Sequence, residues 1–340
     1  MDKLIGSDTF CKDGRGESLK VEDRMGVNER KAIKKKLTFS DEFFKEEVRE
    51  GFLIEKKMKC AWAAQLEVLQ EIDRICRKNG IQYFADSGTL LGAVRHRGFI
   101  PWDDDIDIAM KRDDYRSFFS VAAKELPEGW RFNDGFSHGQ GYGRVVTGDL
   151  HDIGTERLLQ YHGCPYVVGV DIFPLDHVPL VGEEEEAWHL LLEYLWILYN
   201  DLKKGEQCLV NSEFEQNLQQ AEEWCKVKLD RKGNLETQLM RLMNQIAQLY
   251  WGDDAEELEM VVCDWGSEHR YKYKCDWYGD SIYVPFENIV VPIPIKYKEV
   301  LITLYGEDYM IPKRNVGCHD YPFYKKQDML LEQSYKVGNK

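Results

Sequence analysis

One stretch of the chain, Tyr83 to Met110, constrains the fold more than any other, and it reads YFADSGTLLGAVRHRGFIPWDDDIDIAM. Near its end, Asp105 and Asp107 alternate with Ile106 and Ile108. Successive side chains of a strand leave opposite faces, so this alternation predicts a strand with both carboxylates on one face and both isoleucines in the core. Two neighbouring carboxylates repel each other unless something positive lies between them.

A hard divalent cation would relieve this repulsion. Mg²⁺ and Mn²⁺ prefer carboxylate oxygens and share their remaining positions with substrate phosphates. The alternative is a solvated acidic turn, because runs of Asp are common on protein surfaces. Taken alone, the run Asp103-Asp104-Asp105 leaves both interpretations open.

The segment before the acidic run favours the metal site. Ile81 to Ala85 predicts a short strand, and the residues from Asp86 onward predict a turn into a helix. Ser87 or Thr89 can cap that helix, and Gly88 lets backbone N–H groups approach a ligand closely. A helix N-terminus with free amides binds phosphate, although an ordinary capped helix would show the same turn. The order of strand, small-residue turn, helix and Asp-x-Asp strand is more specific than any one of its parts.

The stretch GTLLGAVRHRGFIPWDDDIDI resembles the signature of the LicD-type phosphotransferases. These include bacterial phosphocholine transferases and the fukutin-related proteins, within the polymerase-β-like nucleotidyltransferase superfamily. The pattern of that superfamily, a small-residue turn and then Asp-hydrophobic-Asp on the next strand, falls on Ser87-Gly88-Thr89 and Asp105-Ile106-Asp107. The resemblance implies an α+β fold with a nucleotidyltransferase-like mixed sheet as its core, flanking helices and a helical insertion.

A later strand is expected to supply a third carboxylate. Tyr166 to Leu175 is apolar and β-branched except for Asp171, and a buried acid is costly unless it is paired or bound to a metal. The resemblance agrees, since enzymes of this fold commonly bring a third acid to the Asp-x-Asp pair and the family has a DIFPLD-like segment. We therefore predict that Asp105, Asp107 and Asp171 are catalytic and hold Mg²⁺ or Mn²⁺. Asp176 is expected to cap the turn that follows.

The resemblance also implies a reaction. A CDP-linked donor would place its phosphates at Ser87, Gly88 and Thr89, and Arg95 could pair with them through its bidentate fork. A hydroxyl of a glycan or lipid-linked glycan acceptor would then receive a phospho-alcohol group, phosphocholine being the leading candidate, and CMP would be released. The alternatives are a nucleotidyltransferase that moves NMP to a small hydroxyl compound and a non-catalytic nucleotide or glycan sensor.

Charge and cysteine content limit the other possibilities. The net charge of −15 argues against a general nucleic-acid binder, which would show a basic face. The cysteines, nine in number, are never spaced as CxxC, which suits a reducing compartment better than a disulfide framework. His162 and Cys164 together with Cys318 and His319 could form another metal site, but isolated Cys and His are more often core or surface residues.

No apolar stretch reaches the roughly twenty residues that span a bilayer. The start, MDKLIGSDTFCKDGRG, lacks the apolar core of a signal peptide. We therefore expect a cytoplasmic protein. The basic residues between Arg30 and Lys36 could contact an anionic membrane surface, such as the inner face of the membrane, or belong to a solvated tail.

The chain divides into four expected regions. Residues 1–40 are a mobile polar arm, 41–182 the catalytic core, 183–257 a helical insertion or lobe, and 258–340 an aromatic-rich segment that completes the core.

The sequence also raises questions about one helix boundary, one arginine and the C-terminal aromatic residues. A helical pattern is expected to begin at Ser40 and to stop at Gly80. Arg144 could meet a phosphate or be a surface cation. The aromatic residues near the C-terminus could pack in the core or surround a quaternary ammonium group.

Overall fold

The computed structural model describes residues 36–137, 141–205, 212–250, 255–261, 270–314 and 321–338. Nearly all of the expected arm, 1–40, lies outside these residues. The chain divides after Thr38 into two units, and all the elements below belong to the second, which begins at Phe39.

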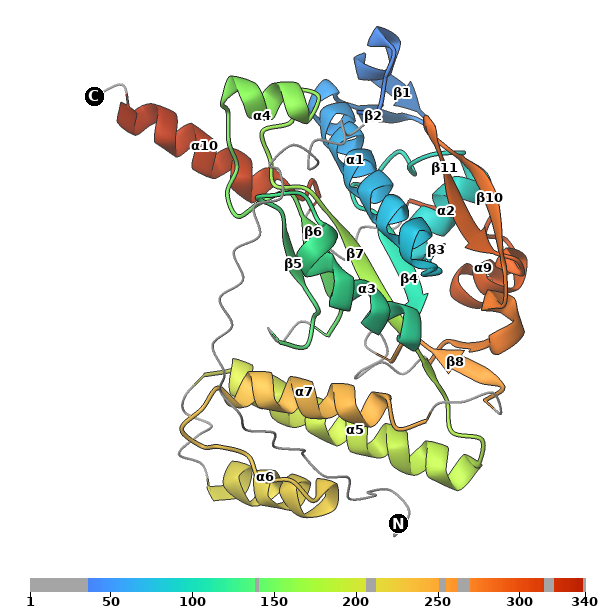
Figure 1. The fold of residues 1–340 in the computed structure, drawn as a ribbon, viewed down its shortest axis with the longest axis vertical. Helices are drawn as coiled ribbons and strands as arrows, with labels where there is room; N and C mark the ends of the chain where they lie inside the picture. Colours follow the sequence, from blue (N-terminus) through green and yellow to red (C-terminus); the bar gives the residue numbers. More distant parts are fainter. Residues whose placement is uncertain are drawn as a thin grey trace, which may run out of the picture. The chain divides into compact units, whose positions relative to one another are not determined.

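A mixed β-sheet forms the centre of this unit (Figure 1). Its strands within the described residues are β3 (Phe84–Ala85), β4 (Asp107–Lys111), β5 (Arg131–Asn133), β6 (Gly143–Val146), β7 (Gly169–His177), β8 (Glu257–Glu259) and β9 (Lys272–Lys274). The order across the sheet is β3-β4-β7-β6-β5, and β8 and β9 extend it from the end of β7. β4 and β7 are parallel, and the other neighbours are antiparallel. The expected α+β fold with a mixed sheet is confirmed.

Two helices, α1 (Lys56–Asn79) and α3 (Arg112–Glu125), cover one face of the sheet (Figure 1). The apolar stripe of α1 is buried as its three- and four-residue spacing predicts, since six of its side chains are at most 1% exposed: Met58, Trp62, Leu66, Leu69, Ile72 and Cys76. Gly80 ends α1 in the left-handed conformation, with φ 66°.

The expected start of this helix at Ser40 is wrong. Ser40 caps a short 3-10 helix, η1 (Asp41–Phe44), and a hairpin of β1 (Glu47–Arg49) and β2 (Phe52–Ile54) follows it. The turn residues Glu50 and Gly51 have φ of 51° and 74°. Positive φ at both central positions matches the right-handed twist of a tight hairpin, so the chain turns back before the long helix begins.

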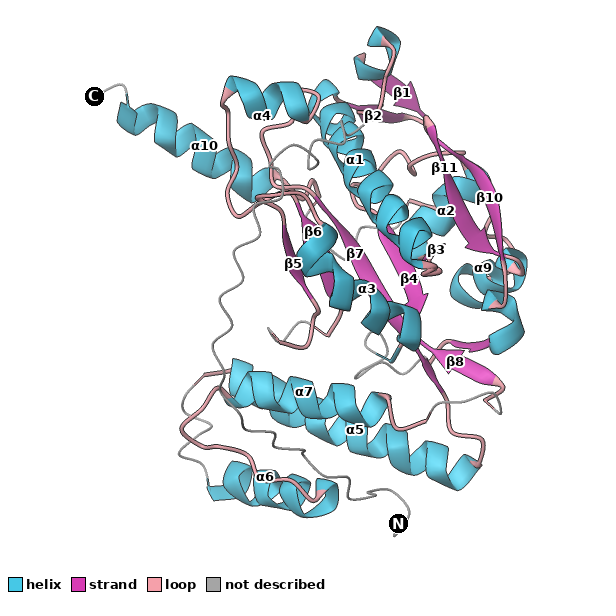
Figure 2. Ribbon diagram, in the orientation of Figure 1, coloured by secondary structure: helices cyan, strands magenta, loops and turns pink. Residues whose placement is uncertain are grey.

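The region after β7 is helical in its described part, as expected (Figure 2). It contains α5 (Gly182–Lys203), α6 (Ser212–Cys225) and α7 (Leu235–Ala247). We call these helices the helical lobe. The indole Nε1 of Trp188 on α5 donates to the carbonyl of Ile246 on α7 at 2.8 Å, which satisfies a polar group inside an otherwise apolar contact.

The remaining elements complete the core. They are α2 (Ser87–Arg95), α4 (Thr155–Gln160), η3 (Cys275–Tyr278), β10 (Ser281–Phe286), β11 (Ile289–Pro294), α9 (Tyr297–Tyr305) and α10 (Lys325–Gly338). β10 and β11 form an antiparallel hairpin that leads into α9 and then Gly306. Among the described residues, none of the helices combines the length and apolarity needed to cross a bilayer.

Candidate active site

The acidic residues lie where a loop leads into β4. Asp103 to Asp105 belong to the loop, and Asp107 is the first residue of β4. Ile106 and Ile108 are each 0% exposed, so their predicted burial is confirmed, whereas Asp105 precedes the strand instead of lying in it. The isoleucines anchor this segment in the core and leave the aspartates on the other side of the chain.

Parallel pairing places Asp107 beside Asp171. The two residues are register partners on β4 and β7, and the N–H of Asp171 donates to the carbonyl of Ile106 at 3.0 Å. Burial, followed by the charges of Asp105 and Asp171, raises the pKa of Asp107 well above its ordinary value. The three predicted carboxylates therefore belong to one electrostatic group, although they come from a loop and two strands.

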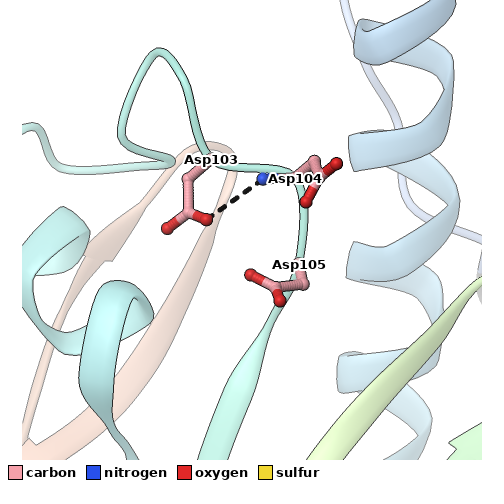
Figure 3. Close-up of side chains that lie close together, drawn as sticks. All are labelled: Asp103, Asp104 and Asp105. Carbon is pink, nitrogen blue, oxygen red and sulfur yellow. Dashed lines mark hydrogen bonds between the residues drawn. The ribbon is translucent and has the colours of Figure 1, made fainter. Parts of the chain in front are cut away.

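Asp103 also belongs to this group, and the sequence interpretation missed it. Its carboxyl is hydrogen-bonded to that of Asp105, and burial followed by the Asp105 charge raises the pKa of Asp103 well above its ordinary value. Among the described residues, Asp103, Asp104 and Asp105 each offer a carboxylate oxygen within 4.8 Å of the others (Figure 3). The acidic run itself was the available signal, but it did not indicate which of its members face the site.

Asp104 has a different role from its neighbours. Its side chain is 0% exposed, and its Oδ2 accepts a hydrogen bond of 2.5 Å from the N–H of Phe323, just before α10. In Figure 3, Asp103 and Asp105 extend to one side of the loop and Asp104 to the other. Asp104 thus anchors the acidic loop to the C-terminal segment.

The turn between β3 and α2 lies directly against these acids. A Cβ added to Gly88 would lie 2.4 Å from Oδ2 of Asp103, so a side chain at this position would displace that carboxylate. The hydroxyl oxygen of Thr89 accepts a hydrogen bond of 2.9 Å from the N–H of Asp107, which ties α2 to the start of β4. Gly88 and Thr89 therefore lie directly against the acidic segment.

The predicted cap of α2, Ser87 or Thr89, is wrong. The N-cap is Asp86, which is 0% exposed and accepts from the N–H of Ser87 at 2.7 Å. The hydroxyl of Tyr278 donates to its other oxygen at 2.9 Å. Burial raises the pKa of Asp86. Thr89 does not cap the helix because its side chain already binds Asp107.

The structure separates Arg95 from the turn. Arg95 is the last residue of α2, and eight residues of helix place it about 12 Å along the axis from Ser87. Its Nη1 donates to the carbonyl of Tyr309 at 2.8 Å. A second arginine, Arg144, does reach the acids, because its Nε lies 2.6 Å from Oδ1 of Asp171.

Two further predictions can be compared with the structure. Asp176 does not cap a turn: it lies inside β7, is 1% exposed, and receives hydrogen bonds of 2.7 and 2.6 Å from Arg112. For the alternative metal site, Cys318 and His319 lie outside the described residues. Nε2 of His162 lies 2.8 Å from an oxygen of Glu67.

Comparison with known proteins agrees with this geometry. Residues 80–183 match the family described as LicD/FKTN/FKRP, nucleotidyltransferase domain. The lipopolysaccharide cholinephosphotransferase LicD of Haemophilus influenzae is 28% identical over 248 residues, which cover 72% of this chain and 88% of that protein. The human ribitol 5-phosphate transferase FKRP is 34% identical over 55 residues, or 16% of this chain and 11% of FKRP.

Shorter matches occur in other bacteria. An uncharacterized protein of Rickettsia prowazekii, RP689, is 48% identical over 48 residues, which make up 14% of this chain and 18% of that protein.

A mixed sheet with an Asp-x-Asp segment beside a helix N-terminus defines a nucleotidyltransferase-like domain. The acids and the α2 turn lie inside the segment that matches the LicD family, so residues 80–183 form a LicD-like nucleotidyltransferase domain. The protein is a LicD-type transferase.

Proposed function

We propose that this protein transfers a phospho-alcohol group from a CDP-linked donor to a hydroxyl of a glycan or lipid-linked glycan, with release of CMP. The observation that supports this proposal is the row of acids at Asp105, Asp107 and Asp171 beside the α2 turn, inside the segment that matches the LicD family. Phosphocholine is the leading candidate for the transferred group, because the relative that the chain matches over most of its length is named a cholinephosphotransferase.

The site fits a divalent cation. Its donors are carboxylate oxygens, which Mg²⁺ and Mn²⁺ prefer. Burial, and after it the charges of neighbouring aspartates, raises the pKa values of Asp103 and Asp107, so a bound cation would relieve both effects. We propose that Asp105, Asp107 and Asp171 hold the ion, which would supply neutralisation of the donor phosphates and of the leaving CMP.

The protein's own groups would position the donor. The N-terminus of α2, where the N–H groups and the helix dipole favour negative charge, lies directly against the acids, and Gly88 lets the Asp103 carboxylate approach it closely. Arg144, now beside Asp171, is 45% exposed at its side chain and can reach a second phosphate oxygen. Asp171 could accept the proton of the attacking hydroxyl. Most of the rate enhancement would come from positioning and charge neutralisation, as in phosphoryl transfer generally.

The test is release of CMP from CDP-choline, CDP-ribitol and CDP-glycerol with Mg²⁺ or Mn²⁺ present, with and without a crude lipid-linked glycan extract. We compare the wild type with Asp107→Asn, which keeps the shape of the side chain and removes its charge. Asp113→Asn is the matched control, because the Asp113 side chain is 85% exposed on α3.

Metal-dependent release from one donor, lost in Asp107→Asn and kept in Asp113→Asn, would support the proposal and identify the alcohol. If NTPs were consumed and all three CDP-alcohols left intact, the protein would instead move NMP from a nucleoside triphosphate. If a folded protein bound CDP-alcohols without turnover, it would be a sensor.

A further inference from the structure

The register of the sheet fixes which side chains share the face of the acids. Asp107 on β4 is opposite Asp171 on β7, and Asp171 is opposite Arg144 on β6. Register partners on neighbouring strands point to the same face. The row Asp107, Asp171 and Arg144 therefore runs across three adjacent strands on one face of the sheet.

The other face is the one that α3 covers. A Cβ added to Gly143 would lie 2.4 Å from the ring of Phe119 and 2.7 Å from the hydroxyl of Tyr115, both on α3. Tyr142 lies just before β6. Arg144 follows Gly143 within the strand, so its side chain leaves on the opposite face from the helix. By the same alternation, Phe173 shares the face of Asp171 along β7.

An aromatic pair lies beside the charged row on this face. The rings of Tyr142 and Phe173 have centroids 4.8 Å apart and planes inclined by 27°, and both residues are only half-buried. Phe173 is two positions along β7 from Asp171, a step of about 7 Å, and Tyr142 lies just before β6, two residues before Arg144. The two rings stack on each other, so an aromatic pair with one outer face on each ring adjoins the place where the acids and Arg144 meet.

We propose that the Tyr142–Phe173 pair is the subsite that stacks the nucleobase of the donor nucleotide. This inference rests on the proposed function, because it takes the phosphates of the same donor to lie over Asp107, Asp171 and Arg144. One step along the strands is the span of a ribose, so a base joined to those phosphates reaches the two rings. Every base has a π-face that stacks on an aromatic side chain.

The charge next to the rings favours a nucleotide over a quaternary ammonium group. The Nε of Arg144 lies 2.6 Å from Asp171, one step along the strands from the pair. With the acids neutralised by the proposed cation, the guanidinium attracts a phosphate and repels a choline head group. The Tyr142–Phe173 pair is therefore expected to bind the base of the leaving nucleotide, not the transferred alcohol.

The test measures binding by calorimetry with Mg²⁺ present, on the 340-residue chain. The ligands are CMP and ribose 5-phosphate, which has the same phosphate and sugar without the base. The variants are Tyr142→Ala and Tyr142→Phe. The matched control is Tyr283→Ala, since Tyr283 is a 49% exposed tyrosine on the β10 hairpin. Melting temperatures are recorded for all of them.

We expect Tyr142→Ala to weaken CMP binding about tenfold, the effect of losing one stacked base, and to leave ribose 5-phosphate binding unchanged. Tyr142→Phe and Tyr283→Ala should bind CMP like the wild type. Equal CMP affinity in Tyr142→Ala would overturn the subsite. So would an equal loss for both ligands with a lowered melting temperature, which indicates packing alone.

Titrations with UMP, AMP and GMP distinguish a failure of the base subsite from a failure of the proposed CDP-linked donor. A protein that releases no CMP from CDP-alcohols, but binds one of these nucleotides through Tyr142, supports the base subsite and contradicts the proposed donor. A wild type that binds none of the four nucleotides better than ribose 5-phosphate overturns the subsite.

Discussion

The pKa of Asp107 lies well above that of an ordinary aspartate, first because of burial and then because of the charges of Asp105 and Asp171. A raised pKa in the folded state means that folding favours the protonated acid. Between the ordinary value and the raised one, the folded protein therefore binds more protons than the unfolded chain. Its free energy of unfolding falls as pH rises through this window.

We predict that Asp107→Asn is more stable than the wild type in EDTA, and that the difference in melting temperature grows from pH 5 to pH 8. Mn²⁺ should raise the melting temperature of the wild type and not that of the variant, because a cation bound only by the folded state stabilises it. Thermal unfolding in both buffers checks this, with Asp113→Asn as the exposed control. A difference that shrinks as pH rises would contradict the sign of the pKa shift.

Asp104 allows a second prediction at the same scale, because its carboxylate accepts a hydrogen bond from the N–H of Phe323. Asp104→Asn keeps an oxygen acceptor and should retain stability and Mn²⁺ affinity. Asp104→Ala leaves a partly buried N–H without its partner and should cost about 1–3 kcal/mol. Urea unfolding and Mn²⁺ titration of both variants check this. If Asp104→Asn lost as much Mn²⁺ affinity as Asp107→Asn, Asp104 would be a ligand rather than an anchor.

Some residues of the candidate site could be predicted from the sequence and others could not, for physical reasons. The alternation of Asp105 and Asp107 with buried isoleucines follows from the two-residue period of a strand, and the single acid of an apolar strand marks Asp171. Which members of the acidic run face the site depends on how the loop is held, so Asp103 and Asp104 could not be told apart. Arg144 reaches Asp171 through strand register, which depends on contacts distant in sequence.

At the scale of elements, a buried ion pair connects the sheet to the helical lobe. Arg112, at the start of α3, binds Asp176 on β7 through two nitrogens, and its third donates to Oδ1 of Asn244 on α7 at 2.9 Å. The side chains of Arg112 and Asp176 are 10% and 1% exposed. Removing only one partner would leave the other charge buried without compensation.

We predict that Arg112→Met lowers the free energy of unfolding by about 3–5 kcal/mol, and that adding Asp176→Leu to it restores a large part of this loss. Arg116→Met is the matched control on the same helix, because the Arg116 side chain is 58% exposed. This control should change stability by about 0.5 kcal/mol or less. Urea denaturation of the four proteins checks the prediction. A double variant no more stable than Arg112→Met would show that the loss comes from packing against Tyr115 and Phe136, whose rings lie 5.4 and 5.3 Å from the guanidinium.

Elements with a long apolar period could be predicted, and short ones could not. The stripe of α1 and the helices after Val181 follow from spacing alone. The β1–β2 hairpin has three residues in each strand and a turn of Glu50 and Gly51, which is not a common hairpin signal, so the helical pattern was extended over it. β8 and β9 are also three residues long, and they form strands because β7 provides an edge for them to pair with.

At the scale of the whole molecule, the chain carries a net charge of −15, and its site is proposed to receive an anionic donor. At low ionic strength the field of these charges reaches about 30 Å and would slow the approach of a CDP-alcohol, whereas at 0.15 M it reaches about 8 Å. With Mg²⁺ saturating, we therefore predict that kcat/KM for the donor rises by about threefold or more as NaCl is increased from low ionic strength to 0.15 M.

If cations dominate the electrostatic field around the site, kcat/KM should instead fall as salt is added. One salt titration distinguishes this case from a field dominated by the acidic surface. Initial rates at low donor concentration are measured with NaCl and with sodium acetate, so that an effect specific to chloride can be recognised. If kcat/KM falls as either salt is added, the bound cation and Arg144 determine the potential that the donor meets, and the acidic surface is too distant to matter. If it rises with both salts, the surface charge acts at the site itself, and substituting exposed acids should speed the reaction without any change in the catalytic residues.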